Sequence, residues 1–95
     1  MVILMDFIHE KSRIYTTDEK GNAIAEVTFP NVTDHVVVIN HTFVDPSLRG
    51  QGVAGKLMEE AVSHLRNNNL KAQLTCSYAV TWFEQHSECG DVLDK

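Results

Sequence analysis

The sequence predicts an α/β fold in which a mixed, mostly antiparallel sheet packs with one long helix and one short helix. The first half of the chain alternates apolar and polar residues at the period of a strand, in runs joined by short turns. The middle switches to the period of a helix, and a strand–helix–strand order over residues 36–75 implies a parallel strand pair with a right-handed crossover. Ninety-five residues are enough for one domain, which we place at residues 1–95.

The strands of the first half should form an antiparallel meander, because the turns between them are short enough for hairpins. Strands are predicted over residues 7–11, 13–17 and 23–29, with a turn over residues 18–22. Residues 36–44 are predicted as one longer strand, since four β-branched residues follow one another at its start.

The second half begins with an amphipathic helix. Apolar residues recur at spacings of three and four, which places them on one helical face: Ala54, Leu57, Met58, Ala61, Val62 and Leu65. The helix should end at residues 67–69, because asparagine tolerates the left-handed conformation that closes many helices. A strand over residues 71–75, a shorter helix over residues 79–86 and a candidate edge strand at residues 92–93 complete the pattern.

Composition narrows the function classes. The net charge is −5 and the eight Lys and Arg residues are dispersed, so we expect no nucleic-acid partner. Two cysteines are too few for a disulfide framework and indicate a reducing, cytoplasmic setting. The apolar residues 1–5 are too short for a signal peptide or a membrane span, so we expect no membrane role. His86 and Cys89 have a metal-like spacing but lack further ligands nearby, so we expect no metal.

The most informative segment runs from Val44 to Leu57. It leads from the end of a strand through a proline turn into a glycine-rich loop, and the loop opens onto the long helix. Glycines let the backbone approach a ligand closely, and the first N–H groups of a helix have no internal partner. The helix dipole adds about half a positive charge at the same end. The segment therefore predicts a site for phosphate or pyrophosphate.

Three phosphate-binding motifs overlap in this loop. A dinucleotide-binding motif, G-x-G-x-x-G, fits residues 50–55. It should directly follow a strand, but residues 46–48 intervene here, and the acidic residue that it requires about 20 positions later is missing from residues 71–77. A P-loop needs Ser or Thr after Lys56, where this chain has Leu57. The third motif, R-x-x-G-x-A over residues 49–54, is the loop that holds the pyrophosphate of coenzyme A in acyltransferases of the GNAT type, and it remains.

The order of elements and the loop together resemble the GNAT (GCN5-related) N-acetyltransferase superfamily, and more narrowly its small single-domain branch of about 100 residues. Besides the loop, the resemblance rests on residues 40–44, Asn-His-Thr-Phe-Val, and on residues 70–78, which run from Leu70 to Tyr78. It covers residues 7–93. It implies acetyl-CoA as the donor, an amine as the acceptor, and a splayed strand pair, residues 36–44 and 71–75, whose gap takes the pantetheine arm.

The resemblance also implies roles for particular residues. Backbone N–H groups of the loop would hold the pyrophosphate, Arg49 would add its side chain, and an N–H near Phe43 or Val44 would polarise the thioester carbonyl. The expected coenzyme-binding residues are therefore Phe43, Val44, Arg49, Gly50, Gln51, Gly52, Val53, Ala54 and Tyr78. Larger members often carry, on the helix after the second splayed strand, a tyrosine that protonates the departing thiolate. Phe83 occupies that position here.

Two side chains, Cys76 and His41, are the main catalytic candidates. Cys76 follows the predicted strand and points to the coenzyme gap if the alignment holds; it could accept the acetyl group, protonate the leaving thiolate, or simply be a small buried residue. Tyr78 is a second candidate acid. His41 is a candidate general base with a pKa suited to neutral pH, or a core residue that shares a strand face with Val37, Ile39 and Phe43.

Two functions follow from these observations. The first is an acetyl-CoA-dependent N-acetyltransferase, whose acceptor amine could be a basic peptide, a polyamine or a small amine. The alternative is a module that binds or senses coenzyme A or acetyl-CoA with little or no turnover. The missing tyrosine and the short N-terminal part, which leaves no wall for an acceptor pocket, favour the alternative.

Overall fold

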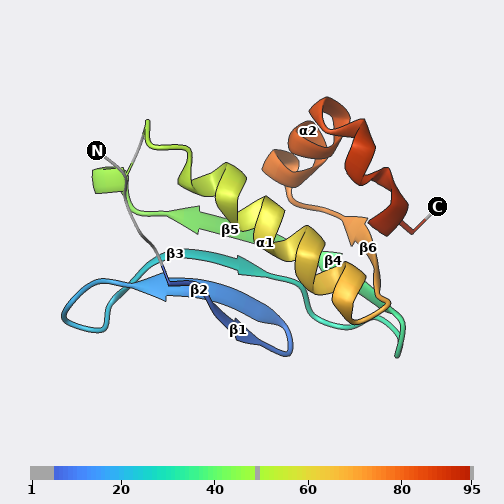
Figure 1. The fold of residues 1–95 in the computed structure, drawn as a ribbon, viewed down its shortest axis with the longest axis horizontal. Coiled ribbons are helices and arrows are strands. Elements are labelled where there is room, and N and C mark those ends of the chain that lie inside the picture. Colours follow the sequence, from blue (N-terminus) through green and yellow to red (C-terminus); the bar gives the residue numbers. More distant parts are fainter. Residues whose placement is uncertain (1–5, 49, 95) are drawn as a thin grey trace.

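The computed structural model describes residues 6–48 and 50–94, which form two layers (Figure 1). The long helix α1 (Val53–Asn67) lies across one face of a four-stranded antiparallel sheet. This sheet has the order β1 (Ile8–Glu10), β2 (Arg13–Thr17), β3 (Ala23–Thr28) and β5 (His41–Val44). A second, parallel pair joins β4 (Val36–Ile39) to β6 (Lys71–Leu74). The predicted α/β class, with a mostly antiparallel sheet and a parallel pair, is confirmed.

The predicted single strand over residues 36–44 is wrong, because the chain leaves one sheet for the other at Asn40. The N–H of Asn40 donates to the carbonyl oxygen of Thr28 at 3.3 Å, and His41 is also the register partner of Thr28. Two residues thus face one across the ladder, which is the definition of a β-bulge. The pairing of β4 with β6 ends here, and that of β5 with β3 begins.

The bulge also reverses which side chains face the helix. Val37 and Ile39 are fully buried, but the side chains of His41 and Phe43 are exposed. A regular strand would place all four on one face, because the side-chain period is two. The prediction that His41 shares a face with Val37 and Ile39 is therefore wrong; it shares its face with Phe43 alone among them.

Helix α1 forms where its apolar spacing predicts. Its buried face consists of Val53, Leu57, Met58, Ala61, Val62 and Leu65, whereas Ala54 is only half-buried. The helix ends as predicted, because Asn69 adopts a left-handed φ of 55° just beyond it. The core beneath the helix comes from the inner faces of the strands, chiefly Ile14, Ala25, Val27, Phe29, Val37 and Ile39.

The C-terminal segment packs against the end of α1. The short helix α2 (Ser77–Gln85) starts two residues earlier than predicted and buries Trp82 and Phe83. A 3₁₀ helix, η2 (Ser87–Val92), follows, so the candidate edge strand is reduced to one bridge between Leu93 and Ala72.

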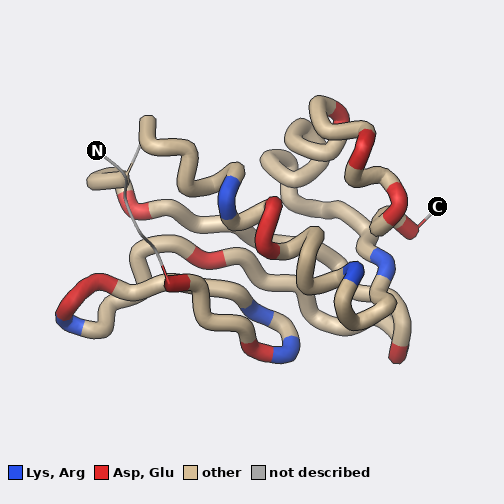
Figure 2. The backbone as a smooth tube through the Cα atoms, viewed as in Figure 1, with Lys and Arg blue, Asp and Glu red and all other residues tan. Residues whose placement is uncertain are grey.

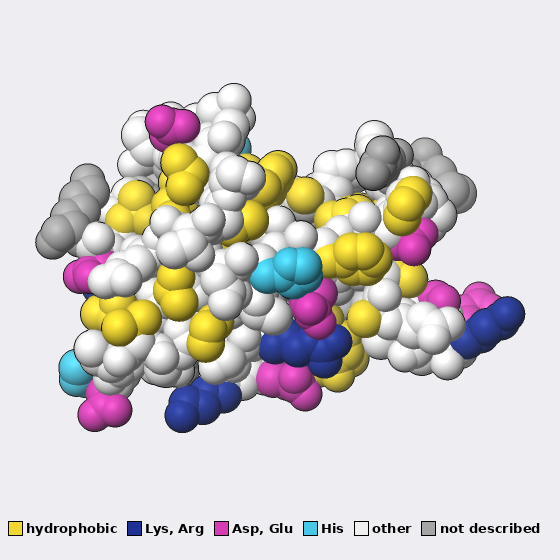
Figure 3. Space-filling view, turned by 180° about the vertical axis from the view of Figure 1, so that it is seen from behind, with side chains coloured by type: hydrophobic (Ala, Val, Ile, Leu, Met, Phe, Trp, Pro, Cys, Tyr) yellow, Lys and Arg dark blue, Asp and Glu magenta, His cyan; other side chains and the backbone are white. Residues whose placement is uncertain are grey.

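The charged residues are spread over the molecule. Figure 2 shows the basic residues dispersed over separate elements, with acidic residues near most of them. Within residues 6–48 and 50–94, no helix is both long and apolar enough to cross a membrane. Seen from behind, the sheet face that α1 leaves open carries scattered hydrophobic side chains around one histidine (Figure 3).

Candidate functional site

The loop before α1 holds two glycines in a conformation that other residues rarely adopt. Gly50 has a φ of 80°, and Gly52, the residue that caps α1, has a φ of 71°. A Cβ atom added at either position would meet no atom of the described residues within 4 Å, apart from its own neighbours in the chain. The glycines therefore satisfy the backbone conformation and leave open space in front of the helix.

The first turn of α1 presents backbone donors to that space. In the described chain no side chain caps the helix, and the first helical bond runs from the N–H of Lys56 to the carbonyl of Gly52 at 3.1 Å. The N–H groups of Val53, Ala54 and Gly55 consequently have no partner within the helix. The N–H of Gln51 instead bonds to the carbonyl of Leu48 at 3.3 Å.

These positions cover most of the predicted loop. Gly50, Gly52, Val53 and Ala54 lie together at the helix start, whereas Arg49 lies outside the described residues. Val53 can contribute only its backbone, because its side chain is buried in the core. Since the described donors are main-chain groups, the site fits a multiply charged oxyanion such as pyrophosphate.

Strand β5 offers a free backbone edge beside this loop. The N–H of Asp45 bonds to the carbonyl of Ile24 at 2.8 Å, so alternate residues of β5, including Phe43, turn their N–H groups to β3. The intervening Thr42 and Val44 turn theirs to the other edge. Of the two residues that the sequence left open, Val44 is thus the one whose N–H faces the gap.

The gap opens where β4 and β6 stop pairing. The carbonyl of Ile39 accepts the N–H groups of both Thr75 and Cys76, each at 3.1 Å, and beyond it the two chains diverge. One continues as β5 along β3, and the other turns into α2. The parallel strands therefore splay, as the resemblance implied, and Cys76 lies at the point of divergence.

Cys76 faces Thr42 across this divergence. Its Sγ lies 3.4 Å from the Oγ1 of Thr42, and Cys76 is also the N-terminal cap of α2. Burial raises the pKa of the thiol, but hydrogen bonds from the Thr42 side chain and from the N–H groups of Ala79, Tyr78 and Thr42 outweigh it, so the pKa is lowered. Donors of this kind stabilise a thiolate.

His41 does not join Cys76. Its side chain is 55% exposed, and its Nε2 lies 3.9 Å from the Oε1 of Glu26 on the open face of the sheet. Neighbouring side chains alternate across a strand, so His41 projects away from the face on which Thr42 contacts the thiol. The two catalytic candidates from the sequence thus lie on opposite faces of β5.

The aromatic residues of α2 divide between core and surface. Tyr78 is 38% exposed, and burial of its ring raises the pKa of its hydroxyl. Phe83 is buried in edge contact with Trp82, at a centroid distance of 5.1 Å. Thr42 is a site residue that the sequence analysis did not single out; its hydroxyl lies 3.4 Å from the sulfur of Cys76. The sequence pattern does not indicate the bulge at Asn40, which determines the face of β5 on which Thr42 lies.

Comparison with known proteins assigns the family. A family model described as GCN5-related N-acetyl-transferase matches residues 13–92. The chain belongs to the GCN5-related N-acetyltransferase family. A GCN5-like protein from Staphylococcus aureus, solved by NMR, is 36% identical, with a TM-score of 0.78 over 95% of this chain and 88% of that one. No curated protein matches the chain.

Two larger proteins share the fold. A ribosomal-protein-S18-alanine N-acetyltransferase from Escherichia coli superposes with a TM-score of 0.62 at 19% identity, over 84% of this chain and 51% of that one. Rv2747 from Mycobacterium tuberculosis, solved with CoA bound, gives 0.63 at 15% identity, over 81% and 48%. The chain spans about half the length of these two proteins.

Proposed function

We propose that this GCN5-related domain binds acetyl-CoA at the glycine loop and the free edge of β5, and transfers the acetyl group to an amine. Acetyl-CoA-dependent transfer is the chemistry of its family. The observation that carries the assignment to these residues is the N-terminus of α1, where backbone donors and two left-handed glycines face open space.

Each part of the site supports one task. The N–H groups of Val53, Ala54 and Gly55, together with about half a positive charge from the helix dipole, would bind the pyrophosphate. The N–H of Val44 would donate to the thioester carbonyl, where negative charge develops during attack. Its place on the free edge of β5 would also let an extended pantetheine chain bond to the strand as an added strand does.

Cys76 is better suited to attack than to proton donation. A lowered pKa increases the thiolate fraction, and the thiolate is the nucleophilic form. Its sulfur would attack the thioester carbonyl, forming an S-acetyl bond as the coenzyme thiolate leaves and takes a proton. A neutral amine would then attack the S-acetyl group, lose a proton and regenerate the thiol.

The assignment of the loop is tested by substituting one glycine and comparing it with a matched control. Gly52→Glu should abolish acetyl-CoA binding in an amide NMR titration, because the added side chain fills the open space and carries the wrong charge. Gly21→Glu is the control: Gly21 has a similar φ of 85° and equally open surroundings, but lies in the turn between β2 and β3 rather than in the loop before α1. Each substitution should cost about 1–2 kcal/mol of backbone strain. Equal binding by both variants would sink the assignment.

The transfer step is tested separately from binding. After incubation with acetyl-CoA, mass spectrometry should find one hydroxylamine-labile acetyl group on Cys76 and none on Cys89. Cys76→Ala should then lose transfer to amines while keeping its affinity for acetyl-CoA. The alternative is a coenzyme-binding or sensing module. It is favoured by the position of His41, the candidate general base, on the open face of the sheet and away from Cys76. Slow transfer that is unchanged in Cys76→Ala would support this alternative.

A further inference from the structure

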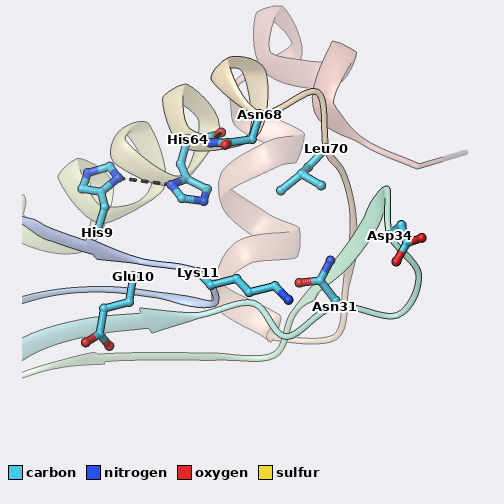
Figure 4. Close-up of a pocket in the computed structure, with 8 residues that line it drawn as sticks. All are labelled: His9, Glu10, Lys11, Asn31, Asp34, His64, Asn68 and Leu70. Atoms are coloured by element: carbon cyan, nitrogen blue, oxygen red, sulfur yellow. Dashed lines mark hydrogen bonds between the residues drawn. The ribbon is translucent and has the colours of Figure 1, made fainter.

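Two histidines meet at the far end of α1 from the glycine loop. His64 lies eleven residues after Val53, about 16 Å along the helix axis. Its Nδ1 lies 3.2 Å from the Nδ1 of His9 on strand β1. Figure 4 shows the two rings pointing toward each other from helix and strand, beside an open cleft of about 480 Å³. The pair therefore lies outside the proposed coenzyme site.

Glu60 selects one tautomer of the neutral His9 ring. Its Oε1 lies 3.0 Å from the Nε2 of His9, so the neutral ring donates its Nε2–H to the carboxylate and leaves a lone pair on Nδ1. That lone pair faces His64. A carboxylate behind the non-ligating nitrogen is the arrangement that orients histidines at metal centres.

The separation of the two nitrogens also fits a metal. With metal–nitrogen bonds of 2.0–2.1 Å and tetrahedral geometry, two ligating nitrogens lie about 3.3 Å apart. The observed distance is 3.2 Å. His64 is held in place by its ring contact with the buried Phe29, at a centroid distance of 5.1 Å. Both nitrogens can bind one ion once the proton that joins them in the unbound pair has moved from the Nδ1 to the Nε2 of His64.

The surroundings favour a cation and leave room for further ligands. The cleft wall carries the carboxylates of Glu10 and Asp34 and the cation Lys11, and Glu60 lies behind His9; Glu10 also pairs with Arg13 at 3.6 Å. The part of the chain that the structure describes contains no group of three or more metal-ligating side chains. Water in the cleft would complete the coordination, which sets the site apart from a closed structural zinc centre.

We propose that His9 and His64 form a binding site for a borderline divalent cation such as Zn²⁺, with Glu60 orienting His9. Imidazole nitrogen suits zinc and its neighbours, whereas magnesium and calcium select oxygen ligands. A bound ion would join edge strand β1 to helix α1. Because the sequence separation of the two ligands is 55 residues, the site exists only in the folded chain.

The test is isothermal titration of the untagged chain with ZnCl₂. One ion should bind per chain, and His64→Gln and His9→Gln should each abolish this binding. Glu60→Ala should weaken it roughly 10- to 100-fold, as expected when a partner behind a ligating histidine is lost. Glu59→Ala and His35→Gln, exposed neighbours in α1 and in the β3–β4 loop, are the matched controls and should bind as the parent does.

Two results would overturn the proposal: no binding at millimolar zinc, or binding that survives His64→Gln unchanged. His64 is half-buried, so His64→Gln could lower stability as well as remove a ligand. His9 lies on an exposed strand, so His9→Gln tests the site without disturbing the core. The melting temperature of the parent, but not of His9→Gln, should rise with zinc. Failure of zinc binding leaves acetyl-CoA binding at the other end of α1 untouched, so the two proposals fail separately.

Discussion

The two cysteines show how local surroundings set the chemistry of one residue type. Cys76 caps a helix and receives hydrogen bonds from Thr42 and from backbone N–H groups, which lower the pKa of its thiol. Burial and the carboxylate of Glu88 raise the pKa of the Cys89 thiol. Both are half-buried, so accessibility alone does not separate them. The difference in thiol pKa arises because more hydrogen-bond donors face the sulfur of Cys76 than face that of Cys89.

We predict that the two thiols titrate on opposite sides of the ordinary cysteine value. In the Cys89→Ala variant, the rate of alkylation by iodoacetamide should reach its midpoint at a lower pH than in Cys76→Ala. Thr42→Val removes the hydroxyl donor and should move the Cys76 midpoint upward. Coincident midpoints would show that the helix terminus has no effect on the thiol.

The lowered pKa of Cys76 also makes the stability of the fold depend on pH. A thiol whose folded-state pKa is lowered releases its proton more readily when folded, so it stabilises the fold above its ordinary pKa of 9.0. This contribution is lost as the pH falls through the folded pKa. The difference in unfolding free energy between Cys89→Ala and the double variant with Cys76→Ser should therefore grow from pH 7 to pH 9.5, as measured by urea denaturation.

At the scale of elements, sequence periodicity predicted helix α1 but not the division of residues 36–44. The helix was predictable because six apolar residues repeat at the helical period on one face. The run Val36–Val44 gives no such signal at Asn40, since a bulge adds one residue without changing the composition of the strand. The exposure of His41 followed from this unseen shift of register, and so did its separation from Cys76.

The register of β5 predicts an alternating pattern of amide exchange. The N–H of Phe43 turns to β3 and should exchange slowly, whereas the N–H of Val44 faces the open edge and should exchange fast in the free protein. Saturating acetyl-CoA should slow Val44 and leave Phe43 unchanged. Hydrogen exchange followed by NMR measures both; equal protection of the two amides in the free protein would contradict the register.

The apolar face of α1 should dominate its contribution to stability. Leu57 is fully buried, and Leu57→Ala should lower the unfolding free energy by about 2–5 kcal/mol through lost burial and a new cavity. Glu59→Ala on the exposed face should change it by less than about 0.5 kcal/mol. Chemical denaturation of both variants makes the comparison; similar losses would mean that the helix packs differently.

At the scale of the whole molecule, the sequence was enough to single out the proposed coenzyme loop and Cys76, because each lies within one short segment. The pair of His9 and His64 was not predictable, since it depends on how a strand and a helix 55 residues apart come together. The C-terminal segment is likewise joined by tertiary contacts. Arg66 of α1 bonds to both carboxylate oxygens of Asp91, at 2.6 and 2.9 Å, and so holds η2 against the helix.

This link should make stability depend on acid. The hydrogen bonds from Arg66 lower the pKa of Asp91 below its usual 3.8, so the pair stabilises the fold above that value and loses its effect as the pH falls through the folded pKa. Arg66→Ala should therefore lower the melting temperature at pH 7, and the difference from the parent should disappear at pH 2. A constant difference across this range would assign the effect to packing of the arginine stem.

The proposed coenzyme gap depends on the bulge at Asn40, and therefore on the number of residues in a strand rather than on their identity. With one residue fewer, β5 would return to the register of β4, and its free edge could close against the chain that follows β6. Substituting Asn40 leaves the spacing intact, but deleting it does not. A library of point substitutions would therefore overlook the residue on which the shape of the site depends, whereas single-residue deletions would reveal it.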